Sequence, residues 1–143
     1  MGLQRMLWEE EDQTRLSLQQ PAADIAELSR LNTAGLSVEH VLPQNPAFDI
    51  ASYGFKDAEE FEEHKHRLGN LLLLEKGLNS ACQNATVESK VTVPTLYAAS
   101  GLVSVKALAA SRVGKPLGYK LENIEERSQS LAQLMLQRWP IAA

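Results

Sequence analysis

The sequence has little that would support a secreted or membrane-bound protein. Its 143 residues contain a single cysteine, Cys82, which excludes an internal disulfide and a zinc knuckle built from cysteine pairs. No apolar run approaches the ~20 residues that a membrane span needs, and the densest apolar patch runs only from Leu71 to Leu74. The charged opening, MGLQRMLWEEEDQTR, does not match a secretory leader. We therefore expect a cytoplasmic protein without a membrane partner.

The chain also lacks an excess of positive charge. Its net charge is −4 and its pI is about 5.4, which argues against a protein that binds nucleic acid regardless of sequence through bulk charge alone. Any phosphate chemistry would need a local site, which we expect to use a metal ion. Hydrophobic residues make up 44% of the chain and charged residues 22%, so a packed core is feasible. The length predicts one domain over residues 1–143.

Apolar spacing and breaker residues predict a mainly α-helical fold with a small β-hairpin, which places the chain in the α+β class. Three parts follow: a helical segment over 1–32, a central core over 36–90 and a helical segment over 91–143. The N-terminal part reads as two helices, the second beginning at Pro21. Further helices are expected at 56–67, 78–90, 97–110 and 121–139, and short strands at 36–42 and 71–74.

The central core carries the one constellation of residues that points to chemistry. It reads VEHVLPQNP over 38–46 and HRLGNLLLLEKGLNSACQNATVESK over 66–90. Glu39 precedes His40 on a strand, Asn70 opens the next apolar strand, and Asn79 follows nine positions later near the start of a helix. Glu39 and His40 would point to opposite faces unless the chain bends there. Singly, each residue is commonly structural, because histidines occupy strands and asparagines form turns and helix caps. Together, their spacing favours a functional site.

This pattern resembles the HNH, or ββα-metal (His-Me finger), nucleases. The strings EHVLPQNP, LGNLLLL, LNSACQN with Lys90 following, LYAAS and IEERSQSLAQLMLQRWP are similar to the C-terminal nuclease domain of GmrSD-type modification-dependent restriction endonucleases. The likeness covers roughly residues 38–140. It implies a ββα-metal core of strand, loop, strand and helix, surrounded by N-terminal and C-terminal helices. It also implies a metal-dependent DNA endonuclease of a type IV restriction system, which acts in phage defence.

The resemblance also implies roles for individual residues. His40 would be the general base, which takes a proton from the attacking water. Glu39 and Asn79 would hold one divalent metal ion, Mg²⁺ or Mn²⁺, through oxygen atoms. Asn70 would tie the loop to the strand by bonds from its side chain to the backbone, and so hold His40 in orientation.

Two further residues are candidates for contact with the substrate. Lys90 would neutralise a phosphate, and Arg67, at the end of the charged run EEHKHR, would contact DNA. His64 and His66 in the same run read as a solvated helix end. The implied partners are DNA and an N-terminal nucleotide-hydrolysing domain or subunit that is absent from this chain. An alternative stays open, in which the chain is a helical DNA-binding or regulatory module that keeps the nuclease scaffold without cleaving.

Overall fold

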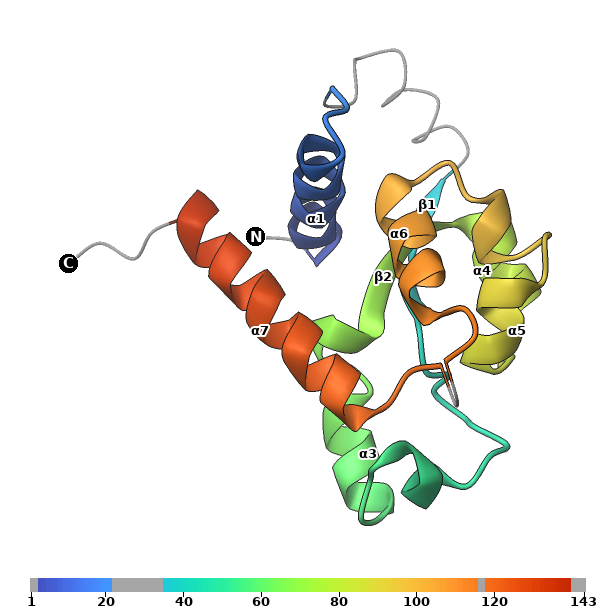
Figure 1. Cartoon of the computed structure of the whole chain (residues 1–143). Helices are drawn as coiled ribbons and strands as arrows, with labels where there is room; N and C mark the ends of the chain where they lie inside the picture. Colours follow the sequence, from blue (N-terminus) through green and yellow to red (C-terminus); the bar gives the residue numbers. More distant parts are fainter. Residues whose placement is uncertain (1–2, 22–34, 116–117, 140–143) are drawn as a thin grey trace.

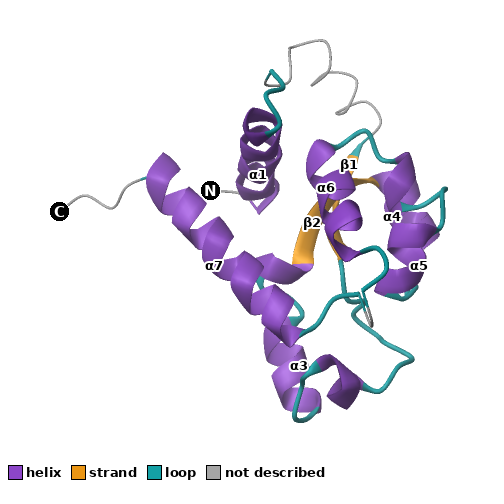
Figure 2. Cartoon of the chain, viewed as in Figure 1, coloured by secondary structure: helices purple, strands orange, loops and turns teal. Residues whose placement is uncertain are grey.

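The computed structural model describes residues 3–21, 35–115 and 118–139, and it has the mainly helical, α+β architecture that the sequence predicts (Figures 1 and 2). In the described part, no helix is both long enough and apolar enough to cross a membrane. The elements, in chain order, are α1 (Leu3–Ser17), β1 (Leu36–His40), η1 (Ile50–Tyr53), α3 (Ala58–His64), η2 (Leu68–Asn70), β2 (Leu71–Glu75), α4 (Lys76–Cys82), α5 (Val87–Thr92), η3 (Tyr97–Ala99), α6 (Val103–Arg112) and α7 (Leu121–Arg138), where η marks a short 3-10 helix.

The two strands form an antiparallel hairpin that is completed by the helix after the second strand. Leu36 pairs with Glu75 at one end of the register and His40 pairs with Leu71 at the other. All four leucines of β2 are buried, because helices cover both faces of the hairpin. Helix α4 contacts both strands, while α1 and α6 contact β2. A strand–loop–strand–helix unit therefore sits inside a helical shell (Figure 1).

Two of the expected helices are each broken into shorter pieces. The predicted helix over 78–90 is interrupted at Gln83, whose φ of +44° and ψ of −125° end α4, and α5 begins after the cap Thr86. The predicted helix over 97–110 divides into η3 and α6 around Gly101. At the N-terminus the first predicted helix is α1. The second, beginning at Pro21, falls on residues 22–34, which lie outside the described residues.

The outer helices are fixed to the hairpin by buried polar contacts. The Glu11 carboxylate of α1 is fully buried and accepts the backbone N–H groups of Val103 and Ser104, which satisfies the N-terminus of α6. On the other side, α7 lies so close to η2 that a Cβ on Gly69 would come within 1.9 Å of the Ile124 carbonyl oxygen. Only glycine fits there, and the entry to β2 is thereby held against α7.

Candidate functional site

A polar cleft of about 260 Å³ opens between the end of β1 with the loop that follows it and the second half of α4. It brings together three of the predicted site residues, Glu39, His40 and Asn79. The other three, Asn70, Lys90 and Arg67, do not line it. Five carboxamide side chains dominate its wall, and the full lining consists of Val38, Glu39, His40, Pro43, Gln44, Asn45, Asn79, Gln83 and Asn84.

The His40 side chain lies at the end of β1 and is partly exposed. Its Nε2 is 2.9 Å from Nδ1 of His66, and its Nδ1 is 3.4 Å from Nε2 of Gln44. Burial of the ring, and then the electrostatic influence of His66, Lys90 and Lys65, together lower the pKa of His40 to about 4. The imidazole is therefore neutral near pH 7, so one ring nitrogen carries a lone pair that can accept a proton.

Asn70 is fully buried and makes bonds from its side chain to the backbone, as the family resemblance implies. Its Oδ1 accepts the N–H of Leu42 at 2.8 Å, and its Nδ2 donates to the carbonyl oxygens of Leu42 at 3.0 Å and Lys65 at 2.9 Å. Its own carbonyl accepts the N–H of Val41 at 2.9 Å. Asn70 thus joins the chain just after His40 to the end of the long loop that returns to β2.

Asn79 of α4 reaches back to the first strand. Its Nδ2 donates to Ser37 Oγ at 2.8 Å and to the Val38 carbonyl at 3.1 Å. Its side-chain oxygen Oδ1 makes no hydrogen bond to the described residues and is therefore available to bind a ligand in the cleft. At the end of α4, Gln83 has a positive φ of 44°, an unfavourable conformation for a residue other than glycine, and the chain turns there. Gln83 and Asn84 complete the wall of the cleft.

Glu39 lies on the opposite face of β1 from His40 and is only 3% exposed. Its Oε2 accepts the Tyr97 hydroxyl at 2.8 Å and lies 3.1 Å from Nζ of Lys90. Burial, followed by the charge of Glu39, raises the pKa of Tyr97 well above its usual value, so the phenol stays protonated and can donate. Glu39 also lines the cleft, and Lys90 balances the charge of its carboxylate there.

Lys90 does not occupy the position that a phosphate contact requires. Its side chain is fully buried, and besides Glu39 its ammonium donates to the carbonyl oxygens of His40 at 2.8 Å and Val41 at 3.0 Å. Three donors are matched by three acceptors. The expectation that Lys90 contacts substrate is thus not met by its position, because α5 packs beneath the end of β1 and directs the ammonium inward.

The end of α3 carries His64, and the loop that follows it carries His66 and Arg67. Arg67 is exposed, and its side chain makes no hydrogen bond or ion pair with the described residues, so it is accessible to a phosphate. His64 is not solvated as expected: it is 7% exposed, packs beside Phe55 and bonds the Glu60 carbonyl. His66 is exposed and touches His40, a contact between residues 26 positions apart that no spacing in the sequence indicates.

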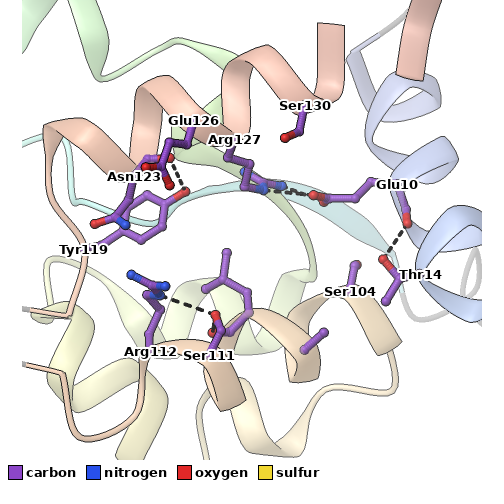
Figure 3. Close-up of a pocket in the computed structure, with 12 residues that line it drawn as sticks. Glu10, Thr14, Ser104, Ser111, Arg112, Tyr119, Asn123, Glu126, Arg127 and Ser130 are labelled. Carbon is purple, nitrogen blue, oxygen red and sulfur yellow. Dashed lines mark hydrogen bonds and ion pairs between the residues drawn. The ribbon is translucent and has the colours of Figure 1, made fainter. Parts of the chain in front are cut away.

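A larger hollow of about 360 Å³ lies between α1, α6 and α7 (Figure 3). Two of its four charged residues, Glu10 and Arg127, form an ion pair. Arg127 pairs with both carboxylate oxygens of Glu10 at 2.6 and 2.8 Å, and its Nη1 donates to the carbonyl oxygens of Leu68, Gly69 and Leu71. Tyr119 also donates to Gly69. These contacts tie α7 and α1 to the start of β2, and none of the predicted site residues lines this hollow.

The donor set of the polar cleft fits a hard divalent cation better than zinc. In the described residues, no group of three or more histidine, cysteine, aspartate or glutamate side chains could hold a metal. Burial, and then Glu39, raises the pKa of Cys82 to about 12, so the thiol is not a thiolate ligand. The cleft instead offers carboxamide oxygens and one carboxylate. Mg²⁺ is commonly held by one or two carboxylates, with waters and substrate phosphates completing its shell.

Comparison with known proteins gives one clear result. The chain matches the family described as GmrSD restriction endonucleases, C-terminal domain, over residues 3–134. No match was found among curated proteins or among solved structures.

Proposed function

The chain belongs to the family of C-terminal domains of GmrSD restriction endonucleases, and we propose that its polar cleft hydrolyses phosphodiester bonds of DNA in the manner of an HNH nuclease. The observation that carries the proposal is the position of His40: its imidazole lines an amide-rich cleft at the end of the first strand of a ββα unit. A general base must be unprotonated and held in place, and His40 meets both conditions.

In this proposal His40 takes a proton from a water molecule, and the resulting hydroxide attacks the scissile phosphorus. Asn70 keeps the backbone after His40 fixed through its bonds to Leu42. The conformational entropy of this segment is therefore lost on folding and not in the reaction step. Lys90 holds the carbonyl groups of His40 and Val41 from below. The bond to the 3′ oxygen then breaks and that oxygen takes a proton from a water molecule, which leaves a 5′-phosphate and a 3′-hydroxyl.

A divalent cation, Mg²⁺ or Mn²⁺, would be held by the Asn79 Oδ1 atom and by the Glu39 carboxylate at the wall of the cleft. When bound, such a cation stabilises the negative charge that develops on the phosphate and on the leaving oxygen. Glu39 would share its charge between this cation and Lys90, which lies 3.1 Å away. Neighbouring carboxamides can donate hydrogen bonds to the phosphate and sugar of the DNA.

Substrate contact outside the cleft is assigned to Arg67, which is exposed one residue after His66, the residue that touches His40. By analogy with the family, the domain would work within a type IV restriction system against modified DNA. A nucleotide-hydrolysing domain or subunit would then deliver the DNA, since the chain has a net charge of −4 and no strong positive charge of its own to attract it. Such a system operates in the cytoplasm.

A second candidate function is a DNA-binding or regulatory module that does not cleave. It is favoured by one observation, the neutralisation of Glu39 by Lys90, which leaves the cleft without a free carboxylate.

Nicking of supercoiled plasmid by the purified chain separates the two functions. The nuclease reading predicts nicked circles with Mg²⁺ or Mn²⁺ and none with EDTA. A mobility shift of the plasmid or of a short duplex, with no nicking under any metal, would support the non-cleaving module. Nicking that persists in EDTA would contradict the role of a divalent cation.

A further inference from the structure

The contact between His40 and His66 joins two imidazole rings in a T-shaped arrangement. Their centroids are 5.0 Å apart with an angle of 78° between the planes, while the two facing nitrogens, Nε2 of His40 and Nδ1 of His66, are only 2.9 Å apart. This is a hydrogen-bond distance between nitrogens, and the rings do not stack. One proton must lie between the two nitrogens, because two protonated nitrogens at this distance would repel each other.

Gln44 indicates which ring supplies that proton. Its amide nitrogen Nε2, which can only donate, faces Nδ1 of His40 at 3.4 Å. Nδ1 of His40 therefore carries the lone pair. A neutral imidazole with a lone pair on Nδ1 has its proton on Nε2, so His40 donates to His66. Nδ1 of His66 then accepts, and the remaining proton of His66 lies on its exposed Nε2, where water can accept it.

The contact is braced from both sides by one buried residue. Asn70 bonds both backbone groups of Leu42, two residues after His40, and also the carbonyl of Lys65, the residue before His66. The N–H of Lys65 is in turn held by the Phe61 carbonyl of α3. The two segments that carry the histidines are thus locked to the same side chain, although His66 itself is exposed.

We propose that His66 is a positioning residue that fixes the tautomer and orientation of His40. By accepting the Nε2 proton of His40, it keeps the Nδ1 lone pair directed at the cleft, where a water molecule can replace the Gln44 amide. The catalytic use of this arrangement rests on the proposed nuclease function. The hydrogen bond itself does not, so it can be tested without any cleavage. Partners that set the tautomer of a functional histidine typically change activity by about 10–100-fold when they are removed.

The first test is nitrogen-15 NMR of the histidine side chains in the wild-type chain and in His66→Ala and His66→Asn. The wild type is expected to show His40 protonated on Nε2, a coupling across the hydrogen bond to Nδ1 of His66, and slow exchange of that proton with water. His66→Ala should speed the exchange at least about tenfold, as expected when a hydrogen bond of roughly 1.4 kcal/mol is lost. His66→Asn should restore protection, because its side-chain oxygen can occupy the place of Nδ1. A His40 ring protonated on Nδ1, or exchange unchanged by His66→Ala, would overturn the proposal.

The second test compares cleavage kinetics with those of the neighbouring variant Arg67→Ala. His66→Ala should lower kcat by about 10–100-fold with KM nearly unchanged, and His66→Asn should recover most of the rate. Arg67→Ala, a substrate contact in the proposed function, should raise KM and leave the NMR signature of His40 intact. If His66→Ala raises KM and leaves kcat unchanged, His66 contacts DNA and does not position His40. If the wild type does not cleave, the nuclease proposal fails, and the NMR result still decides whether His66 orients His40.

Discussion

Replacing His40 by alanine is expected to lower the rate of DNA cleavage by about 10²–10⁴-fold, the usual contribution of a general base. The structure gives the physical reason. The ring is neutral because its pKa is lowered to about 4, it lines the cleft, and no other histidine does. Single-turnover nicking of plasmid at saturating Mg²⁺ measures the effect without the influence of product release.

Two control experiments show whether the loss of rate is a loss of proton transfer. His40→Asn keeps a polar side chain that can still donate or accept a hydrogen bond, but it has no basic nitrogen, so it should be about as slow as His40→Ala. Imidazole added to the solution should restore part of the rate to His40→Ala and have little effect on the wild type. A His40→Asn protein that cleaves within about threefold of the wild-type rate would show that His40 is not the base.

Replacing Lys90 by methionine is expected to lower the free energy of unfolding by about 3–5 kcal/mol, since it removes one partner of a buried ion pair. Methionine has a similar volume, so little of the loss would come from a cavity. The loss would come from Glu39, left 3% exposed without its cation, and from the unbonded carbonyl groups of His40 and Val41. Urea unfolding followed by circular dichroism measures the change.

A double variant distinguishes the buried charge from simple loss of contact. Lys90→Met combined with Glu39→Gln should be more stable than Lys90→Met alone, because no uncompensated carboxylate is left inside. As a control, Lys106→Met removes an exposed lysine of α6 and should change stability by less than about 0.5 kcal/mol. A Lys90→Met protein within about 1 kcal/mol of the wild type would contradict the role assigned to this lysine as the buried anchor of β1.

Local patterns in the sequence predict the elements that form the site. The apolar run after Asn70 is β2, the segment ending at His40 is β1, and both observed spans differ from the expected ones by at most two residues. The strands depend on short-range spacing and on the polarity of neighbours, which a single sequence displays directly. The bonds of Asn70 to the loop are instead those that the resemblance to the HNH nucleases implies.

Features that depend on tertiary packing could not be predicted from the sequence. Lys90 looks like an exposed cation in a helix, and only the packing of α5 under β1 turns it inward. Glu11 stands in a run of acidic residues near the N-terminus, and nothing in its spacing indicates that its carboxylate caps α6 across the molecule. His66 belongs to a charged run after a helix, and its contact with His40 arises because a loop of about thirty residues returns to β2 beside the end of β1.

The chemistry of the cut ends reports which group attacks the phosphorus and which oxygen leaves. Plasmid nicked by the wild-type chain in Mg²⁺ should be resealed by DNA ligase, which requires a 3′-hydroxyl beside a 5′-phosphate, and cleavage in ¹⁸O-labelled water should place the label on the 5′-phosphate. Both results follow if His40 activates water and the 3′ oxygen departs. Nicks that ligase cannot seal, or a label on a 3′-phosphate, would contradict the proposed mechanism.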